Sequence, residues 1–133
     1  MKGFLQAISF LTILPVGQAH APEGKDLARS MAFFPLVGLV IGLLLALGHH
    51  FFSLFLPKAV VLWFVIGLLA FLTRGLHLDG LADTMDGLAS GGTKEKILEV
   101  MRDSRIGAFG VISLILLLGA KFFCLDQIPD SSL

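Results

Sequence analysis

The sequence is poor in cysteine, in charged residues and in net charge. Its 133 residues include a single cysteine, Cys124, which excludes an internal disulfide and a cysteine-based metal site. Charged residues make up only 15% of the chain against 56% hydrophobic residues, too little charge to cover the surface of a soluble domain. The formal net charge is zero, so no basic surface indicates a nucleic-acid partner. These shortages favour a protein embedded in a lipid bilayer.

Long uncharged runs predict an all-α, polytopic integral membrane protein, with residues 1–133 forming one membrane domain. The first spanning candidate covers about 31–56 and the last about 106–123, each long enough to cross a bilayer. Between them, the apolar run 59–72 is short for a crossing. It reaches full length only if the helix continues through 73–78, so we expect about three spanning helices.

The N-terminal residues 1–16, MKGFLQAISFLTILPV, predict an amphipathic helix lying at the membrane interface. Orientation follows from the positive charges, because cytoplasmic loops carry an excess of Lys and Arg. Three of these residues precede the first span and five lie between the second and third spans, whereas the two other connections carry one each. This asymmetry predicts that the N-terminus and the region 73–110 lie on the cytoplasmic side of the membrane.

The charge that the chain does have is concentrated in residues 73–110, which hold six of its ten acidic residues. Asp79, Asp83 and Asp86 are spaced by four and three residues, which on a helix puts their carboxylates within an arc of about 60°. Like charges on one face repel each other. A bound Mg²⁺ or Mn²⁺ would offset this repulsion, since both ions prefer oxygen ligands. The alternative is a solvated acidic face at the end of a helix.

Two glycines, Gly80 and Gly87, lie seven residues apart beside these carboxylates. Each costs helix stability relative to alanine, and the sequence shows no structural return for that cost. A stripe of glycines would let a bulky substrate approach the helix backbone. The glycines therefore favour a metal and substrate site over a plain acidic surface.

A second charged cluster, formed by residues 102–105, follows the acidic helix closely. Gly91-Gly92 is predicted to break that helix, and Thr93 to cap a short helix over 94–102. The short helix can fold back and bring Asp103 towards the three aspartates. Asp103 would then complete the metal shell or act as a proton acceptor in catalysis.

The arginines of this cluster, Arg102 and Arg105, have two possible roles. Their guanidinium groups could clamp phosphate oxygens, which next to metal-binding carboxylates would suit diphosphate chemistry. They could instead be ordinary cytoplasmic anchors, with Asp103 capping the last span. The residues alone leave both roles open.

The motifs HLDGLADTMDGL (77–88) and MRDSRIGAFGV (101–111) resemble the membrane-bound cobalamin synthases, the adenosylcobinamide-GDP ribazoletransferases. FLQAISFLTILPV (4–16) and FFPLVGLVIG (33–42) resemble the same family, so the likeness covers nearly the whole chain to about Leu118. Family members continue further with more membrane spans. The chain is therefore similar to the N-terminal portion of such an enzyme.

The resemblance implies a Mg²⁺-dependent transferase acting on adenosylcobinamide-GDP and on α-ribazole or its 5′-phosphate. A ribose hydroxyl attacks the diphosphate, GMP leaves, and adenosylcobalamin or its 5′-phosphate is formed. We expect three sets of site residues on this basis. They are the metal ligands Asp79, Asp83 and Asp86, the catalytic residues Arg102, Asp103 and Arg105, and the substrate-binding residues His77, Gly80, Gly87 and Ser104.

Alternatives to this function are a prenyltransferase, a transporter and a scaffold. A membrane prenyltransferase also holds Mg²⁺-diphosphate on aspartate-rich helices, but a second aspartate-rich motif is expected there. A cation or proton transporter would need acidic groups near the middle of the membrane. A non-catalytic scaffold would leave the aspartate row unexplained.

DTMDGLAS (83–90) also partly resembles the CDP-alcohol phosphotransferase pattern. Ser90 stands where that pattern has arginine, and the downstream aspartate pair of the pattern is missing. The likeness therefore serves only as an analogy of mechanism.

Overall fold

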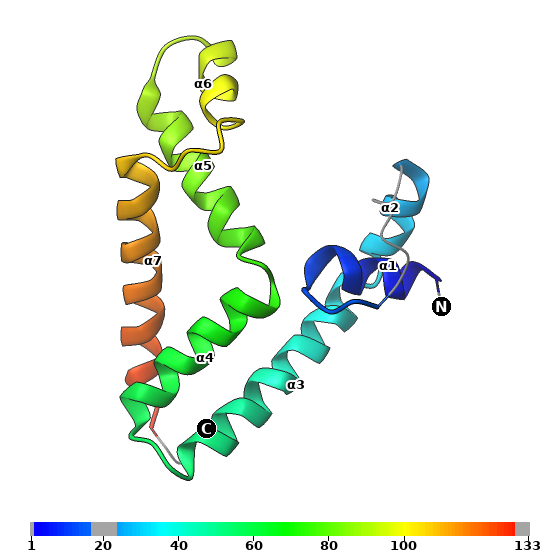
Figure 1. The fold of residues 1–133 in the computed structure, drawn as a ribbon, viewed down its shortest axis with the longest axis vertical. Helices are drawn as coiled ribbons and strands as arrows, with labels where there is room; N and C mark the ends of the chain where they lie inside the picture. Colours follow the sequence, from blue (N-terminus) through cyan, green and yellow to red (C-terminus); the bar gives the residue numbers. More distant parts are fainter. Residues whose placement is uncertain (1, 17–23, 130–133) are drawn as a thin grey trace. The chain divides into compact units, whose positions relative to one another are not determined.

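The computed structural model describes residues 2–16 and 24–129, and within these segments every regular element is an α-helix, with no strand (Figure 1). The all-α prediction is confirmed. In chain order the helices are α1 (Lys2–Leu11), α2 (Gly24–Met31), α3 (Phe34–Ser53), α4 (Lys58–Leu72), α5 (Leu76–Ser90), α6 (Lys94–Val100) and α7 (Ala108–Asp126). They form two compact units, Met1–Arg74 with α1 to α4 and Gly75–Leu133 with α5 to α7.

The first unit has a small core between α1 and α3. Ala7 and Ile8, on the apolar face of α1, are buried together with Val37 of α3. Thr12 follows α1, donating its hydroxyl to the Ile8 carbonyl at 2.7 Å and accepting the Leu14 N–H at 3.2 Å. The amphipathic pattern of the N-terminus therefore serves helix packing within this unit.

Two helices, α3 and α7, are long and apolar enough to cross a membrane, and α4 with α5 would make a third if counted as one broken span. These limits apply to the described residues. Large apolar side chains on both helices point outward, as Leu47 on α3 and Leu116 on α7 illustrate with exposed fractions of 67% and 66%. Such surfaces are costly in water and suited to lipid. The described residues therefore have the character of a membrane protein, with two helices that could span a bilayer, or three if α4 and α5 count as one broken span.

The helix predicted to run without a break from 59–72 through 73–78 is interrupted in the structure. α4 ends at Leu72, and α5 begins only at Leu76. Arg74 and Gly75 between them have φ values of 53° and 68°, in the left-handed region. An α-helix of L-residues cannot continue through two left-handed residues. The prediction of a continuous helix was wrong.

The second unit packs α5 against both α6 and α7 (Figure 1). Gly91 and Gly92, with φ values of 62° and 91°, end α5 at the predicted break. Thr93 caps α6 as predicted, since its hydroxyl accepts the Lys96 N–H at 3.4 Å. The helix itself is two residues shorter than predicted and ends at Val100.

Gly87 has a structural role that the sequence did not reveal. A methyl group at this position would lie 2.6 Å from Cγ of Met101 and 3.2 Å from the carbonyl oxygen of Ile97. Gly87 therefore allows the α6 backbone to approach α5 closely. The expectation that neither glycine of the acidic helix has a structural return was wrong for Gly87, whereas Gly80 has open space around it.

Candidate functional site

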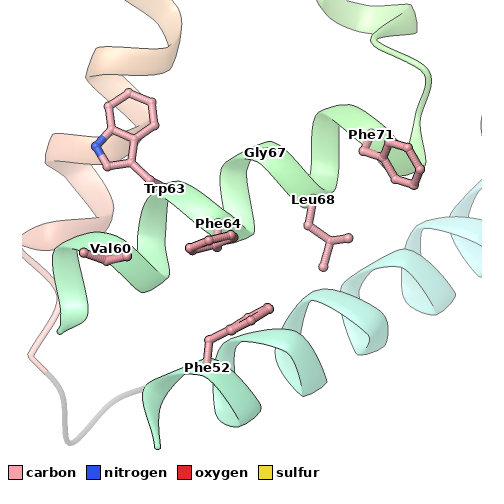
Figure 2. Close-up of a pocket in the computed structure, with 7 residues that line it drawn as sticks. All are labelled: Phe52, Val60, Trp63, Phe64, Gly67, Leu68 and Phe71. Carbon is pink, nitrogen blue, oxygen red and sulfur yellow. The ribbon is translucent and has the colours of Figure 1, made fainter. Parts of the chain in front are cut away.

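Two hollows in the described part of the chain differ sharply in their linings. A groove of ≈ 480 Å³ in the first unit is walled by apolar residues of α3 and α4 (Figure 2). These are Phe52, Val60, Trp63, Phe64, Gly67, Leu68 and Phe71. The groove offers no charged side chain that could hold a diphosphate.

The second hollow, of ≈ 210 Å³, lies within the second unit and is rich in charged groups. Its lining consists of Asp79, Ala82, Asp83, Met101, Arg102, Asp103, Ser104 and Ile106. It combines three carboxylates, a guanidinium and a hydroxyl in one small space. We take this hollow as the candidate site and call it the acidic cavity.

One wall of the acidic cavity is formed by α5. Asp79 and Asp83 lie four residues apart and so occupy one face of the helix, one turn from each other. Ala82 beside them is buried, and its small side chain leaves room for the opposite wall. Asp83 is half-buried, whereas Asp79 is exposed.

The opposite wall is the connection between α6 and α7. Because α6 folds back along α5, residues 101–106 reach the cavity and place Arg102, Asp103 and Ser104 across from Asp79 and Asp83. The predicted approach of Asp103 to the aspartate row is confirmed for these two aspartates. The wall carries all but one of the residues 102–105, since Arg105 does not line the cavity.

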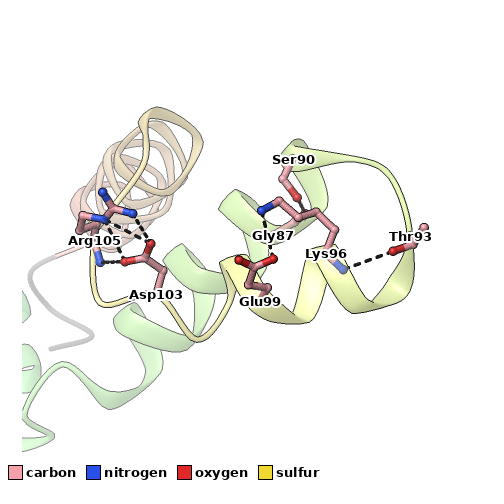
Figure 3. A network of polar contacts seen from close by, with 7 residues as sticks. All are labelled: Gly87, Ser90, Thr93, Lys96, Glu99, Asp103 and Arg105. Atoms are coloured by element: carbon pink, nitrogen blue, oxygen red, sulfur yellow. Dashed lines mark hydrogen bonds and ion pairs between the residues drawn. The ribbon is translucent and has the colours of Figure 1, made fainter.

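Arg105 instead holds Asp103 in a bidentate ion pair (Figure 3). Its Nη2 lies 2.6 Å from Oδ2 of Asp103 and its Nε 3.1 Å from Oδ1, and its backbone N–H also donates to Oδ1 at 3.1 Å. These hydrogen bonds lower the pKa of Asp103 to about 2 and raise the pKa of Arg105. A carboxylate with so low a pKa is a weak proton acceptor near neutral pH.

Asp86, the third aspartate of the row, does not line the acidic cavity. Its Oδ2 accepts the Gly107 N–H at 2.6 Å and its Oδ1 accepts the Gly110 N–H at 2.8 Å. Within the described residues, no three His, Cys, Asp or Glu side chains converge to hold a metal ion. The structure therefore separates Asp86 from the two aspartates with which the sequence grouped it.

The capping role considered for Asp103 falls to Asp86 in the structure. Gly107 is the N-cap residue of α7 and Gly110 lies in its first turn, and neither has a side chain that could cap the helix. A span that opens with glycine at both of these positions has no cap from its own side chains there, and this was the available signal for a cap from a distant residue such as Asp86.

The remaining predicted residues lie outside the cavity. His77 and Gly80 are exposed on α5, and Gly87 faces Met101. Sequence reasoning missed the apolar members of the lining, namely Ala82, Met101 and Ile106. Their types give no chemical signal, because they supply shape rather than charge.

Comparison with known proteins identifies the family. A family model described as cobalamin-5-phosphate synthase (CobS) matches residues 3–133. The chain belongs to the CobS family. It is 48% identical to an adenosylcobinamide-GDP ribazoletransferase from Geotalea daltonii over 122 residues, which are 92% of this chain and 49% of the relative.

Other CobS relatives with the same name give the same result. The enzyme from Alkaliphilus metalliredigens is 40% identical over 98% of this chain and 52% of its own length. The enzyme from Caldanaerobacter subterraneus is 35% identical over 100% of this chain and 54% of its own length. The chain thus spans about half the length of the curated relatives that it matches. No solved structure matches it.

Membership of the CobS family confirms the resemblance found in the motifs HLDGLADTMDGL and MRDSRIGAFGV. Both motifs contribute to the acidic cavity, the first through α5 and the second through residues 101–106. The family is one of transferases in cobalamin biosynthesis. The two walls of the cavity are therefore built from the two segments that carried the resemblance.

Proposed function

We propose that this chain carries the diphosphate site of a Mg²⁺-dependent adenosylcobinamide-GDP ribazoletransferase. The observation that supports this most strongly is the acidic cavity, where Asp79 and Asp83 face Arg102 and Ser104. The substrates are adenosylcobinamide-GDP and α-ribazole or its 5′-phosphate, and the products are GMP and adenosylcobalamin or its 5′-phosphate. The names of the relatives point to the same reaction.

The cavity suits Mg²⁺ although it holds no preassembled cage of ligands. Mg²⁺ keeps much of its hydration and is usually held by one or two carboxylates together with substrate phosphates. Asp79 and Asp83 supply two such carboxylates on one helix face. Asp86 does not line the cavity, and each of its carboxylate oxygens already accepts a backbone N–H. When bound, the ion neutralises charge on the diphosphate oxygens.

The wall opposite the aspartates would hold the substrate. Arg102 offers a planar guanidinium that can donate two parallel hydrogen bonds to phosphate oxygens, and Ser104 offers a hydroxyl. In the reaction a ribose oxygen forms a new bond to phosphorus, and the anhydride bond to GMP breaks with its electrons leaving on GMP. His77 and Gly80 lie exposed on α5, where a substrate larger than the cavity would contact them.

Asp103 would accept the proton of the attacking hydroxyl once Arg105 has released it. Arg105 has a side chain that is 87% exposed, so it can turn from Asp103 to the arriving diphosphate. Losing the guanidinium lets the pKa of Asp103 rise towards its ordinary range, because the side-chain hydrogen bond from Arg105 is the largest cause of its lowering. Substrate binding would thus turn Asp103 into a stronger base.

In the cell, the chain would form a single multi-pass domain of the bacterial inner membrane, with residues 73–110 facing the cytoplasm. The support is the excess of Lys and Arg before the first span and between the second and third spans. This side is where nucleotide-linked substrates and Mg²⁺ are available.

The decisive experiment incubates membranes containing the complete protein with adenosylcobinamide-GDP, α-ribazole and Mg²⁺. We expect GMP and a cobalamin product to appear together, and neither to form when α-ribazole or Mg²⁺ is omitted. Membranes with the Asp83→Asn variant at equal expression are the matched control. Absence of both products from the unsubstituted protein would overturn the proposal.

A further inference from the structure

We propose that Asp86 is a positioning residue, which caps α7 from a distance and thereby holds residues 101–106 against Asp79 and Asp83. The contact itself is a property of the fold, whereas its effect on catalysis rests on the proposed function. Asp86 would then belong to the same acidic row as Asp79 and Asp83 but would do a different task.

The two hydrogen bonds of Asp86 reproduce a complete helix cap. In a capping box, the N-cap side chain accepts the N–H of the third helical residue, and the side chain of that residue accepts the N–H of the N-cap. In α7 these two positions are Gly107 and Gly110, and neither can supply a side chain. The carboxylate of Asp86 accepts both N–H groups, at 2.6 Å and 2.8 Å. Its negative charge also suits the positive end of the helix dipole.

The glycines at both positions are explained by the same contact. A methyl group on Gly107 would lie 2.5 Å from Oδ1 of Asp86, and one on Gly110 would collide with Oδ2. Any other residue at either site would displace the carboxylate from the start of α7. The carboxylate and the two glycines therefore form one unit, although 21 and 24 residues separate them.

Two adjacent residues of α5 fix both ends of the cavity wall. Gly87 lies against the side chain of Met101, the first residue of the wall, because its lack of a side chain lets α6 approach closely. Asp86 accepts a hydrogen bond from the N–H of Gly107, which directly follows the last residue of the wall. The segment between these anchors carries Arg102, Asp103 and Ser104 into the acidic cavity. Releasing the Asp86 anchor would let this wall move away from Asp79 and Asp83.

This role predicts an energetic coupling between Asp86 and Gly110 that a metal ligand would not show. In the complete protein, Gly110→Ala should lower the melting temperature strongly, because the methyl group collides with the carboxylate. In an Asp86→Ala background the collision is gone, so the same Gly110→Ala change should be much milder. Equal damage by Gly110→Ala in both backgrounds would overturn the contact.

The catalytic consequence is tested by kinetics per folded molecule. Asp86→Asn keeps one acceptor oxygen and Asp86→Ala keeps none, so kcat should fall in that order, with a loss of about tenfold or more for alanine. The KM for adenosylcobinamide-GDP should rise in the same order, because the wall formed by residues 101–106, which carries Arg102, is displaced. A purely structural role would reduce the yield of folded protein and leave both constants unchanged, which would contradict the proposal.

The Mg²⁺ dependence separates positioning from metal binding. Asp86→Asn should leave the half-saturating Mg²⁺ concentration within about twofold of its original value, whereas Asp83→Asn should raise it about tenfold or more. A rise of that size for Asp86→Asn would show a metal ligand and overturn the inference. If the unsubstituted protein forms no GMP, the proposed function fails, while the melting-temperature cycle still decides whether Asp86 caps α7.

Discussion

Arg105 and Asp103 form a bidentate ion pair in which Nη2 lies 2.6 Å from Oδ2 and Nε 3.1 Å from Oδ1. The two side chains stand in different places with respect to the acidic cavity, because Asp103 lines it and Arg105 does not. The exposed guanidinium of Arg105 therefore lowers the pKa of a carboxylate that lines the cavity, although Arg105 itself lies outside the lining. Any role of Asp103 in proton transfer depends on what Arg105 contacts at that moment.

Replacing the guanidinium of Arg105 by an ammonium group tests whether Arg105 turns from Asp103 to the diphosphate of the substrate. Arg105→Lys keeps the charge but lacks the planar fork that can hold a carboxylate and then a diphosphate. We expect kcat/KM to fall by about one to two decades with normal expression. Steady-state assays of GMP release provide the measurement. Full activity of this variant would mean that Arg105 is only a cytoplasmic anchor.

The pH dependence of stability follows from the lowered pKa of Asp103. A carboxyl group with a depressed folded-state pKa stabilises the protein above its unfolded pKa of about 3.9, and loses that effect as the pH falls through about 2. Between about pH 5 and 8 the pair is ionised in the folded and the unfolded chain. Asp103→Asn should therefore shift the melting temperature by a constant amount across this range. Curves of melting temperature against pH that converge within the range would contradict this assignment.

The two aspartates of the acidic cavity should share the Mg²⁺ dependence. Asp79→Asn and Asp83→Asn each keep size and remove a charged ligand, so activity should fall and the Mg²⁺ requirement should rise. Glu99→Gln is the matched control, because Glu99 is exposed and makes only a surface ion pair with Lys96 (Figure 3). Titration of activity with Mg²⁺ gives the answer. Unchanged dependence in Asp83→Asn would exclude a metal role for Asp83.

The two glycines of α5 should respond differently to the same substitution. Gly87→Ala brings a methyl group to 2.6 Å from Met101 and 3.2 Å from the Ile97 carbonyl, so it should destabilise by about 1–3 kcal/mol. Gly80→Ala meets open space and should stabilise the helix by up to about 1 kcal/mol. Thermal unfolding of both variants makes the comparison. A loss of activity in a stable Gly80→Ala protein would support substrate contact at Gly80.

Membrane orientation can be tested with single cysteines in a Cys124→Ala background, since Cys124 is itself exposed. Ser90→Cys, at the end of α5, should resist an impermeant thiol reagent applied to intact cells and react after permeabilisation. Ser53→Cys, at the last residue of α3, borders the connection that carries a single lysine and should react from outside. The reverse pattern would overturn the predicted orientation.

Local sequence determined the helical elements and most of their ends. Long apolar runs produced α3 and α7, Gly91-Gly92 ended α5, and Thr93 capped α6. These features depend on residues within a few positions of one another, so periodicity and capping rules could find them. The four-residue spacing of Asp79 and Asp83 likewise sufficed to place both on one face of α5.

The break at Arg74 and Gly75 was not predictable from composition. A glycine is common enough inside apolar helices, and Arg74 gives no signal of the left-handed conformation that it adopts. The sequence also grouped Asp86 with the other two aspartates, because a spacing of three residues is compatible with one face.

By itself, then, the sequence determined a helical membrane protein, its family motifs and the carboxylates of one helix face. The tertiary structure alone decided which aspartate of α5 caps α7 and which aspartates line the acidic cavity. The start of α7 is capped by Asp86, whereas Asp79 and Asp83 line the acidic cavity together with Asp103. The physical reason is that a hydrogen bond needs two groups within about 3 Å. For residues 21 or 24 positions apart, that distance is set by how α5, α6 and α7 pack and by no local pattern.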